Sequence, residues 1–347
     1  MSLARAIETG DLAELPSRRD EDWRWTDLRG LIRELPEASP VAEGALSVAP
    51  FAALDAEEFA IVNGRGPYVI TVANDAGPRV VALRIIAAAN AQAHVASVHV
   101  VVGVGGRLTL LESYEGDASE YLANTELTIS LRNGAQLERI ILADDAASGV
   151  SVSIANIRSM GPGASFAQTV LTTGARRQRL ETHVTHPGAG ASVRLDGVYL
   201  LADQRHADIT TVVTHTGTDG TTSQLTKGVV RDQARGVFQG RIVVSPGADK
   251  TDARMGHHAL ILSARAEVDA KPELLIYADD VACAHGNTVG ALDEDALFYA
   301  EQRGIPEAEA KAMLTEAFVG EVVDRIDHEG ARDVVRAWVA ERLRGAA

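Results

Sequence analysis

The chain has a single cysteine, Cys283, among its 347 residues. One cysteine excludes an intrachain disulfide, and no metal cage built from cysteines fits such a sequence. Aromatic residues make up only 4% of the chain. No apolar run approaches the 18 or more residues that a helical membrane span requires. These shortages argue against a disulfide scaffold, a cysteine-rich zinc domain and an integral membrane protein.

Positive charge is also scarce, because 33 Lys and Arg residues face 48 Asp and Glu residues and the formal net charge is -15. Nucleic-acid binding and adhesion to an anionic membrane both need a basic face, so we expect neither partner. Acidic residues appear too early for a signal peptide, which predicts a cytoplasmic protein. The hydrophobic content of 46% predicts a globular chain with one sizeable core.

Two common catalytic motifs are missing from the sequence. No Gly-x-x-x-x-Gly-Lys-Ser/Thr stretch occurs, which excludes a P-loop ATPase on this chain. No Gly-x-Ser-x-Gly nucleophile elbow occurs either. The glycines of Gly103–Gly106 lead into a strand-like run and not into a helix, so we expect a turn there.

A repeat occupies the middle of the chain. Four glycine-led units follow one another at spacings of 29, 29 and 27 residues, with weaker echoes at Gly220 and Gly247. The four units are Gly105–Leu108, Gly134–Leu137, Gly163–Phe166 and Gly190–Val193. A fixed period of this size is typical of a solenoid, and the strand-like flanks without helical periodicity favour a β-solenoid. The alternative is a sandwich of hairpins, for which Asn133-Gly134 is a strong local signal.

We therefore expect one β body over residues 61–290, between helical regions at residues 1–60 and 291–347. The N-terminal region shows helical periods around Leu12–Leu15 and Trp23–Leu31. After residue 290, Asp293 is a plausible N-cap, Gly304 should end the first helix and Pro306 should begin the second. An apolar stripe then runs from Ala310 through Met313, Leu314, Ala317 and Phe318 to Val322 and Ile326, and a last helix is expected over residues 331–343.

Cys283 and His285 are the most interesting candidate site residues. Their spacing in a strand places both side chains on one face, where they could form part of one site, and a nearby imidazolium would favour the thiolate. The alternative is a buried, inert cysteine beside a structural histidine, and the residues alone favour that alternative.

The remaining basic and histidine positions carry weaker signals. His183 and His186 should point to opposite faces of a strand, as should His257 and His258, while His206 and His215 are assigned to separate runs. Histidines that are distant in the sequence could still lie close together, because the coils of a solenoid stack on one another. Arg176, Arg177 and Arg179 form a small basic cluster that we interpret as a solvated turn.

Several ordered segments of the C-terminal half resemble the SufB/SufD family of iron–sulfur cluster assembly proteins. Ile276–Gly286 followed by Thr288–Gly290 is the strongest match. The other segments are Lys227–Asp232, Arg235–Ile242, Lys250–Ala253, Ala266–Val268, Lys271–Leu274, Leu292–Glu294, Leu297–Tyr299 and Arg303–Ile305, with weaker similarity at Leu195–His215, Pro16–Asp20 and Trp23–Leu28.

Within this family the chain is similar to the SufD branch. SufB-like chains carry extra cysteines and a His-Glu-Ala-Thr type of sequence where this chain has Cys283-Ala284-His285-Gly286. Two departures from the family pattern stand out. Asn287 replaces the usual alanine, and a Gln with two Asn is replaced by Met255, His257 and Ala259.

The resemblance implies a right-handed parallel β-helix core flanked by helical ends. It implies a scaffold that is not an enzyme, pairs with a SufB-like subunit through the core and docks a SufC-like ATPase through its C-terminal helices. His285 would be a metal ligand at that interface, with Cys283 beside it. The expected docking residues are Leu297, Met313, Leu314 and Phe318. No cofactor would be held stably by this chain alone, since one imidazole and one thiolate cannot complete a cluster site; a transient iron–sulfur cluster would need ligands from the partner.

Two other functions remain open from the residues. A β-helix enzyme acting on acidic polysaccharide would use paired carboxylates, for which Asp208, Asp232 and Asp252 are candidates without any inferable pairing. A stand-alone homo-oligomeric structural protein is the other, because the open end of a β-helix has unpaired edge strands. The same edge makes a homodimer expected when the chain is isolated.

Overall fold

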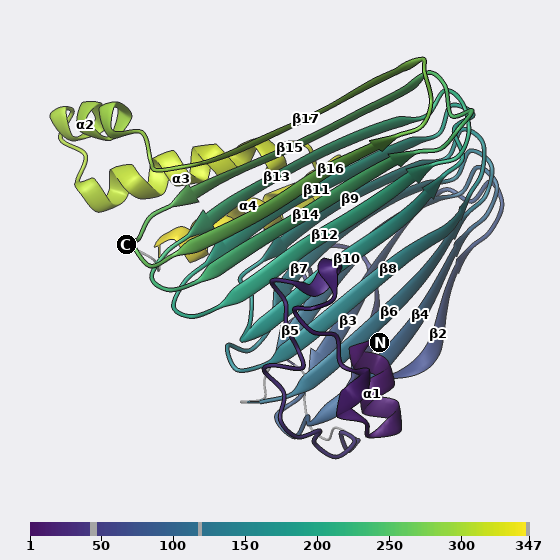
Figure 1. Ribbon diagram of the computed structural model, residues 1–347, viewed down its shortest axis with the longest axis horizontal. Helices are drawn as coiled ribbons and strands as arrows, with labels where there is room; N and C mark the ends of the chain where they lie inside the picture. The colour runs from purple at the N-terminus through teal and green to yellow at the C-terminus, as the bar shows by residue number, and fades with distance from the viewer. Residues whose placement is uncertain (42–46, 117–119, 345–347) are drawn as a thin grey trace.

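The computed structural model describes residues 1–41, 47–116 and 120–344. Its body is a parallel β-solenoid made of two sheets, which confirms the expected fold class (Figure 1). Every strand pairs with the strand two places along the chain, so the chain alternates between the sheets as it winds. This connectivity explains the period near 29 residues, because one coil contains two strands and two turns.

The nine-stranded sheet contains, in spatial order, β1 (Glu57–Val62), β3 (Pro78–Ala87), β5 (Arg107–Gly116), β7 (Gln136–Asp144), β9 (Ser165–Thr172), β11 (Ser192–Leu201), β13 (Thr221–Val230), β15 (Thr251–Ile261) and β17 (Val281–Gly290). The eight-stranded sheet contains β2 (Arg65–Val72), β4 (Ala93–Val102), β6 (Leu122–Leu131), β8 (Val150–Met160), β10 (Arg177–His186), β12 (His206–His215), β14 (Arg235–Val244) and β16 (Glu267–Ile276).

The repeated glycines lie at the turns between strands. Gly105, Gly134, Gly163 and Gly190 all have φ between 63° and 71°, a left-handed conformation that side chains other than glycine rarely adopt. At the next turn Asp219 takes this conformation with φ of 59°, which explains why the repeat weakens there. The hairpin alternative is wrong, because the Asn133-Gly134 turn joins β6 to β7, which lie in different sheets.

The interior of the solenoid is closely packed and mostly aliphatic, as in Val98, Leu110, Ile129 and Val213. Alternate residues of each strand face inward and stack on their counterparts in the next coil, so that one coil buries its apolar row only against its neighbours. The interior also contains polar side chains, most prominently the ion pair between Arg139 and Glu112 at 2.6 Å, in which both side chains are almost fully buried.

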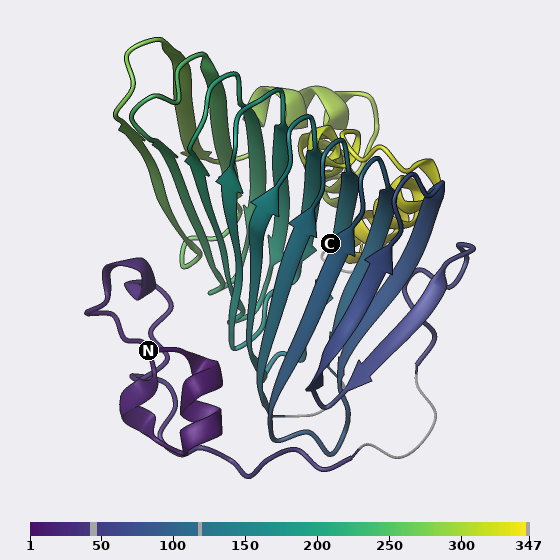
Figure 2. The ribbon, with the colours of Figure 1, turned by 90° about the vertical axis from the view of Figure 1, so that its right-hand side faces the viewer.

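The N-terminal segment covers the outer face of the eight-stranded sheet, opposite the C-terminal helices (Figure 2). It contains the short helix α1 (Leu3–Thr9) and two 3₁₀ turns at Leu12–Glu14 and Glu21–Trp23. The expected helical period over Trp23–Leu31 is wrong. These apolar residues pack with Leu3 and Val150 against the sheet, so their spacing reflects contacts with the sheet and not a helix.

Three helices follow the last strand: α2 (Glu294–Gln302), α3 (Glu307–Val323) and α4 (Glu329–Arg344). Asp293 caps α2 by accepting bonds from the backbone N–H groups of Asp295 and Ala296, as expected. Gly304 lies in the break before α3 with φ of 84°. Apolar residues of α3 and α4 pack on the outer face of the nine-stranded sheet, while α2 extends beyond the solenoid (Figure 1). Among the described residues, no helix is both long and apolar enough to cross a membrane.

Candidate functional site

The last coil of the solenoid has two exposed edges. β17 is the final strand of the nine-stranded sheet and β16 is the final strand of the eight-stranded sheet. Within the described residues, each of them therefore has a pairing partner on only one side. Next to these edges, Leu275, Ile276 and Tyr277 are 39%, 40% and 62% exposed. Unpaired strand edges beside exposed apolar side chains are a template for pairing with another chain.

Cys283 and His285 lie side by side on this last coil. Cys283 is in register with Ala253 and His285 with Met255, both of which point into the solenoid and are buried. The two candidates therefore continue the inward-facing row of β15, on one face of the strand as the spacing predicts. No further coil covers them, so Cys283 is half-buried and His285 is exposed. The His285 side chain has no hydrogen-bond partner among the described residues, which leaves its ring nitrogens available to an iron atom.

The Cys283 side chain is in a less reactive environment. It packs beside Phe238 and Met255 at the edge of an apolar cluster. Burial raises the pKa of the thiol, and the Asp252 carboxylate raises it further. A hydrogen bond with the Ala253 backbone lowers the pKa and offsets part of this rise. His285 is not one of the groups that shift this pKa, which favours the inert cysteine over a thiol activated by a neighbouring imidazolium. These effects disfavour the thiolate, which is the nucleophilic and metal-binding form of cysteine.

One residue that the resemblance marks as a departure, His257, connects the interior to the open coil. His257 is fully buried and stacks on the Phe238 ring at a centroid distance of 4.8 Å. Its Nε2 accepts a bond of 2.9 Å from the Tyr199 hydroxyl, and its Nδ1 donates a bond of 2.6 Å to Asn287 Oδ1. Burial lowers the pKa of His257 to about 4, so the ring is neutral at physiological pH.

One residue from each of the two expected departures, His257 and Asn287, thus belongs to one hydrogen-bonded unit. Asn287 is exposed at the open coil, two residues beyond His285, whereas Tyr199 is fully buried three coils away. Sequence reasoning singled out His257 and Asn287 as departures, and His257 also as one of two adjacent strand histidines, but gave neither a role. The signal that could have joined them was their shared register, since His257 and Asn287 are opposite each other in the β15–β17 pair.

The other histidines do not add metal ligands to this coil. His183 and His186 do point to opposite faces: His183 bonds Glu181 on the outside, and His186 stacks on the buried His215 at 4.3 Å. The assignment of His206 and His215 to separate runs is wrong, because they are the two ends of β12. Among the described residues, no three His, Cys, Asp or Glu side chains gather as a metal site.

The interpretation of Arg176, Arg177 and Arg179 as a solvated turn is wrong for Arg179, which is fully buried. Its guanidinium lies 2.7 Å from the equally buried Asp208 carboxylate and bonds the backbone carbonyl of Asp22. Asp208 also accepts a bond of 2.5 Å from Thr26. This buried ion pair therefore anchors the N-terminal segment to the solenoid. Sequence reasoning missed it because Thr26 and Asp208, which join the segment to the pair, are 182 residues apart.

The four expected docking residues differ in exposure. Met313 is 51% exposed, whereas Leu297, Leu314 and Phe318 are half-buried. Phe318 packs against the core between the helices and the nine-stranded sheet, and the Lys227 ammonium lies over its ring at 4.4 Å. Phe318 therefore contributes to the packing of α3 on the sheet as well as to the surface available to a partner.

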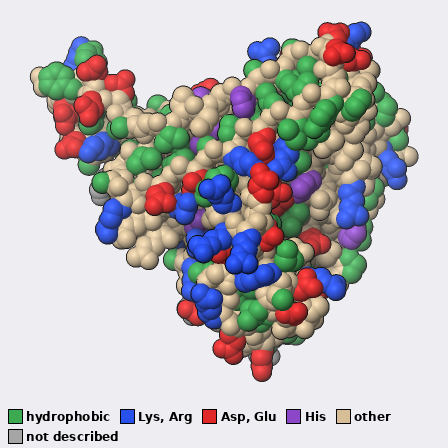
Figure 3. Space-filling model, viewed as in Figure 1, with side chains coloured by type: hydrophobic (Ala, Val, Ile, Leu, Met, Phe, Trp, Pro, Cys, Tyr) green, Lys and Arg blue, Asp and Glu red, His purple; other side chains and the backbone are tan. Residues whose placement is uncertain are grey.

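Two exposed aromatic residues of α2 were not singled out as docking residues. Phe298 and Tyr299 are both 61% exposed, although they follow Leu297 directly in the sequence. In Figure 3 this region is the projection at the upper left, with hydrophobic and acidic side chains on its visible face. An exposed aromatic and aliphatic surface of this kind is suited to a protein partner.

Comparison with known proteins identifies the family. Residues 84–318 match the family model described as SUF system FeS cluster assembly, SufBD core domain. The chain belongs to the SufBD family. It is 28% identical to the iron–sulfur cluster assembly protein SufD of Escherichia coli over 99% of this chain and 92% of that protein. It is 26% identical to an iron–sulfur cluster assembly SufBD family protein of Mycobacterium tuberculosis, over 96% of this chain and 90% of the relative.

A shorter segment is similar to Bacillus subtilis SufD, with 36% identity over 40% of this chain and 31% of that protein. The matched model covers the solenoid from β3 through β17 and continues to Phe318 in α3, which includes both the open coil and the α2 projection. The chain is therefore a SufD-like protein of the SUF system of iron–sulfur cluster assembly, as the sequence motifs indicate.

Proposed function

We propose that this SufD-like chain is a non-catalytic scaffold that pairs with a SufB-like subunit at its last coil. The observation that carries the proposal is that the solenoid ends on two unpaired strand edges beside an exposed imidazole. A SufB-like solenoid would extend both sheets across this edge through backbone hydrogen bonds. His285 and Cys283 would then become buried between the two subunits.

In this arrangement His285 is the primary iron ligand supplied by the chain. Imidazole is a suitable ligand for iron, and the ring of His285 is accessible and without a hydrogen-bond partner among the described residues. Cys283 is a secondary candidate, because its raised pKa disfavours the thiolate that iron requires. Two such ligands hold half of a site at most, so the nascent cluster is a transient cargo whose remaining ligands come from the partner.

The SufC-like ATPase would dock on the C-terminal helices. The supporting observation is the exposed surface formed by Phe298, Tyr299 and Met313, together with the half-buried Leu297 and Leu314. Since α3 packs on the nine-stranded sheet, a force applied to this surface would reach the solenoid directly. The ATPase belongs on another chain, because the sequence lacks a P-loop.

The positions of the three candidate carboxylates also favour a scaffold over a polysaccharide hydrolase. Asp208 is fully buried against Arg179, Asp252 lies 3.2 Å from Arg254 Nε, and Asp232 is 3.9 Å from Arg231 Nε. A glycosidase needs two carboxyl groups facing each other across a cleft.

A cytoplasmic location remains a prediction from the N-terminal sequence.

The pairing and ligand roles can be tested by co-expressing the chain with SufB and SufC from its own organism. His285→Ala should leave the purified complex intact and abolish most of the iron–sulfur absorbance after anaerobic reconstitution. The matched control is His258→Ala, which removes a histidine from the adjacent strand, where the ring points outward and bonds Thr288. Unchanged absorbance in His285→Ala, or equal losses in both variants, would refute the ligand role.

ATPase docking can be tested with Phe298→Asp combined with Met313→Asp. The double variant should lose SufC in a pull-down while it retains SufB, because only the α2–α3 surface is altered. Val104→Asp is the control, since Val104 is an exposed apolar residue at a solenoid turn, with 43% exposure. Retention of SufC by the double variant, or by a chain without residues 293–330, would overturn the docking assignment.

A further inference from the structure

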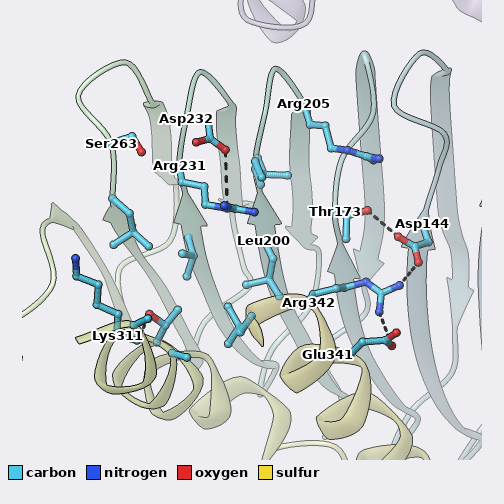
Figure 4. Close-up of a pocket in the computed structure, with 18 of the residues that line it drawn as sticks. Asp144, Thr173, Leu200, Arg205, Arg231, Asp232, Ser263, Lys311, Glu341 and Arg342 are labelled. Atoms are coloured by element: carbon cyan, nitrogen blue, oxygen red, sulfur yellow. Dashed lines mark hydrogen bonds and ion pairs between the residues drawn. The ribbon is translucent and has the colours of Figure 1, made fainter. Parts of the chain in front are cut away.

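A cavity of about 900 Å³ lies between the nine-stranded sheet and helices α3 and α4 (Figure 4). Its floor crosses successive coils at equivalent positions, from Asp144 and Thr173 to Leu200 and Val229, and ends at Leu262 after β15. Neighbouring strands of a sheet are about 4.8 Å apart, so these five coils span about 19 Å. The cavity is thus long and narrow, with a volume in the range of small-ligand sites.

The lining of the cavity is aliphatic where it is apolar. Leu200 and Val229 form the floor, and Ala308 and Ala312 of α3 and Leu343 of α4 form the opposite wall. None of the described residues that line it is aromatic or a histidine, so it offers no ring on which a nucleobase or another planar ligand could stack. A flexible aliphatic chain fits such a lining better than a ring system does.

The charges around the cavity are mostly paired. Arg342 contacts Asp144, Lys311 contacts Glu307, and Figure 4 shows the contact between Arg231 and Asp232. Arg205 is different, because its hydrogen bonds within the described residues go to two backbone carbonyls, of Asp145 at 3.1 Å and of Gly174 at 2.8 Å. Among the described residues no carboxylate pairs with its guanidinium, which lies at the polar end of the cavity, next to Thr173.

We propose that this cavity binds a long-chain carboxylate, with its head beside Arg205 and its aliphatic chain along Leu200, Val229 and Leu262. A guanidinium offers two parallel N–H donors to a carboxylate. The Thr173 hydroxyl at the same end of the floor already donates a bond of 2.8 Å to Asp144, so Arg205 supplies the recognition of the head group. The chain would run under Ala308 and Ala312 of α3. This site is separate from the open last coil, and it requires neither the SufB-like partner nor a cluster.

The direct test is calorimetric titration of the purified chain with saturated carboxylates from octanoate to palmitate, below their micellar concentrations. One ligand should bind per chain, and affinity should rise about fourfold for each added methylene until the chain fills the cavity. Decan-1-ol should bind at least tenfold more weakly than decanoate. Absence of saturable binding for every chain length would overturn the proposal, as would equal affinity for the alcohol and the acid.

Two variants locate the site. Ala312→Phe fills the cavity and should weaken palmitate binding at least tenfold, whereas Ala317→Phe, on an exposed position of the same helix, should not change it. Arg205→Gln should remove the preference for decanoate over decan-1-ol without abolishing alcohol binding. Thermal unfolding of each variant shows whether it is folded. Equal affinities in Ala312→Phe and Ala317→Phe, or a carboxylate preference that survives in folded Arg205→Gln, would place binding elsewhere.

Discussion

Replacing His257 should change how the stability of the protein depends on pH. Burial lowers the pKa of this histidine from 6.5 to about 4, so the unfolded chain binds one more proton than the folded chain between those values. The folded state therefore loses stability as pH falls from 6.5 to 4. A difference of 2.5 pKa units corresponds to about 3 kcal/mol, and the slope approaches 1.4 kcal/mol per pH unit inside the window.

His257→Leu removes this titration and should flatten the pH dependence by that amount. At pH 7.5 the same variant should be less stable than the wild type, since Tyr199 loses a buried hydrogen-bond partner at a cost of about 1–3 kcal/mol. The curves of the two proteins should thus converge as the pH is lowered. Urea-unfolding midpoints, followed by circular dichroism at steps between pH 4 and pH 8, measure both effects.

Tyr199→Phe is the matched control, because it removes the same hydrogen bond and leaves the imidazole in place. It should be destabilised by about 1–3 kcal/mol at all pH values, because the buried His257 Nε2 loses its partner, and it should keep the wild-type slope. An NMR titration of the His257 ring gives an independent value of its pKa. A midpoint near 6.5, or a His257→Leu slope equal to that of the wild type, would refute the reasoning.

Three further outcomes follow from buried contacts and exposed edges. Arg139→Met should destabilise the fold by about 3–5 kcal/mol by leaving Glu112 buried and unpaired, and Glu112→Gln in the same chain should recover most of that loss in urea unfolding. Gly228→Ala should destabilise the fold by at least 1–3 kcal/mol, because the Cβ of the alanine would lie 1.9 Å from the buried Tyr199 ring, and a lower melting temperature would show this loss. The isolated chain should elute as a homodimer in light-scattering chromatography, and Ile276→Glu at the open coil should make it a monomer; a dimer in that variant would place the contact elsewhere.

The open coil explains how a chain with one cysteine can serve cluster assembly. In the proposed arrangement its own contribution is an accessible imidazole, a half-buried thiol and two strand edges that would pair with a partner. A site completed only by association would make cluster formation depend on the partner and on any movement of the subunits. Coupling through α3, which packs on the solenoid, offers a route for such movement.

Local rules determined much of the architecture from the sequence alone. The glycine-led period predicts the solenoid, because each turn needs a left-handed residue at the same place in every coil. Asp293, Gly304 and Pro306 predict the helix boundaries after the last strand, since caps and breaks depend on near neighbours. The side-chain alternation of a strand was sufficient to place Cys283 and His285 on one face.

The three-dimensional contacts decided what such rules cannot reach. Arg179 lies in a basic cluster of the sequence, yet it is buried, because Asp208 faces it from the next strand and Asp22 and Trp23 cover it from the N-terminal segment. The connection from Tyr199 through His257 to Asn287 crosses coils, so its members are separated by tens of residues. Whether Cys283 becomes a thiolate also depended on the packing around it. Energies of burial and of pairing arise between distant segments, and only the fold brings those segments together.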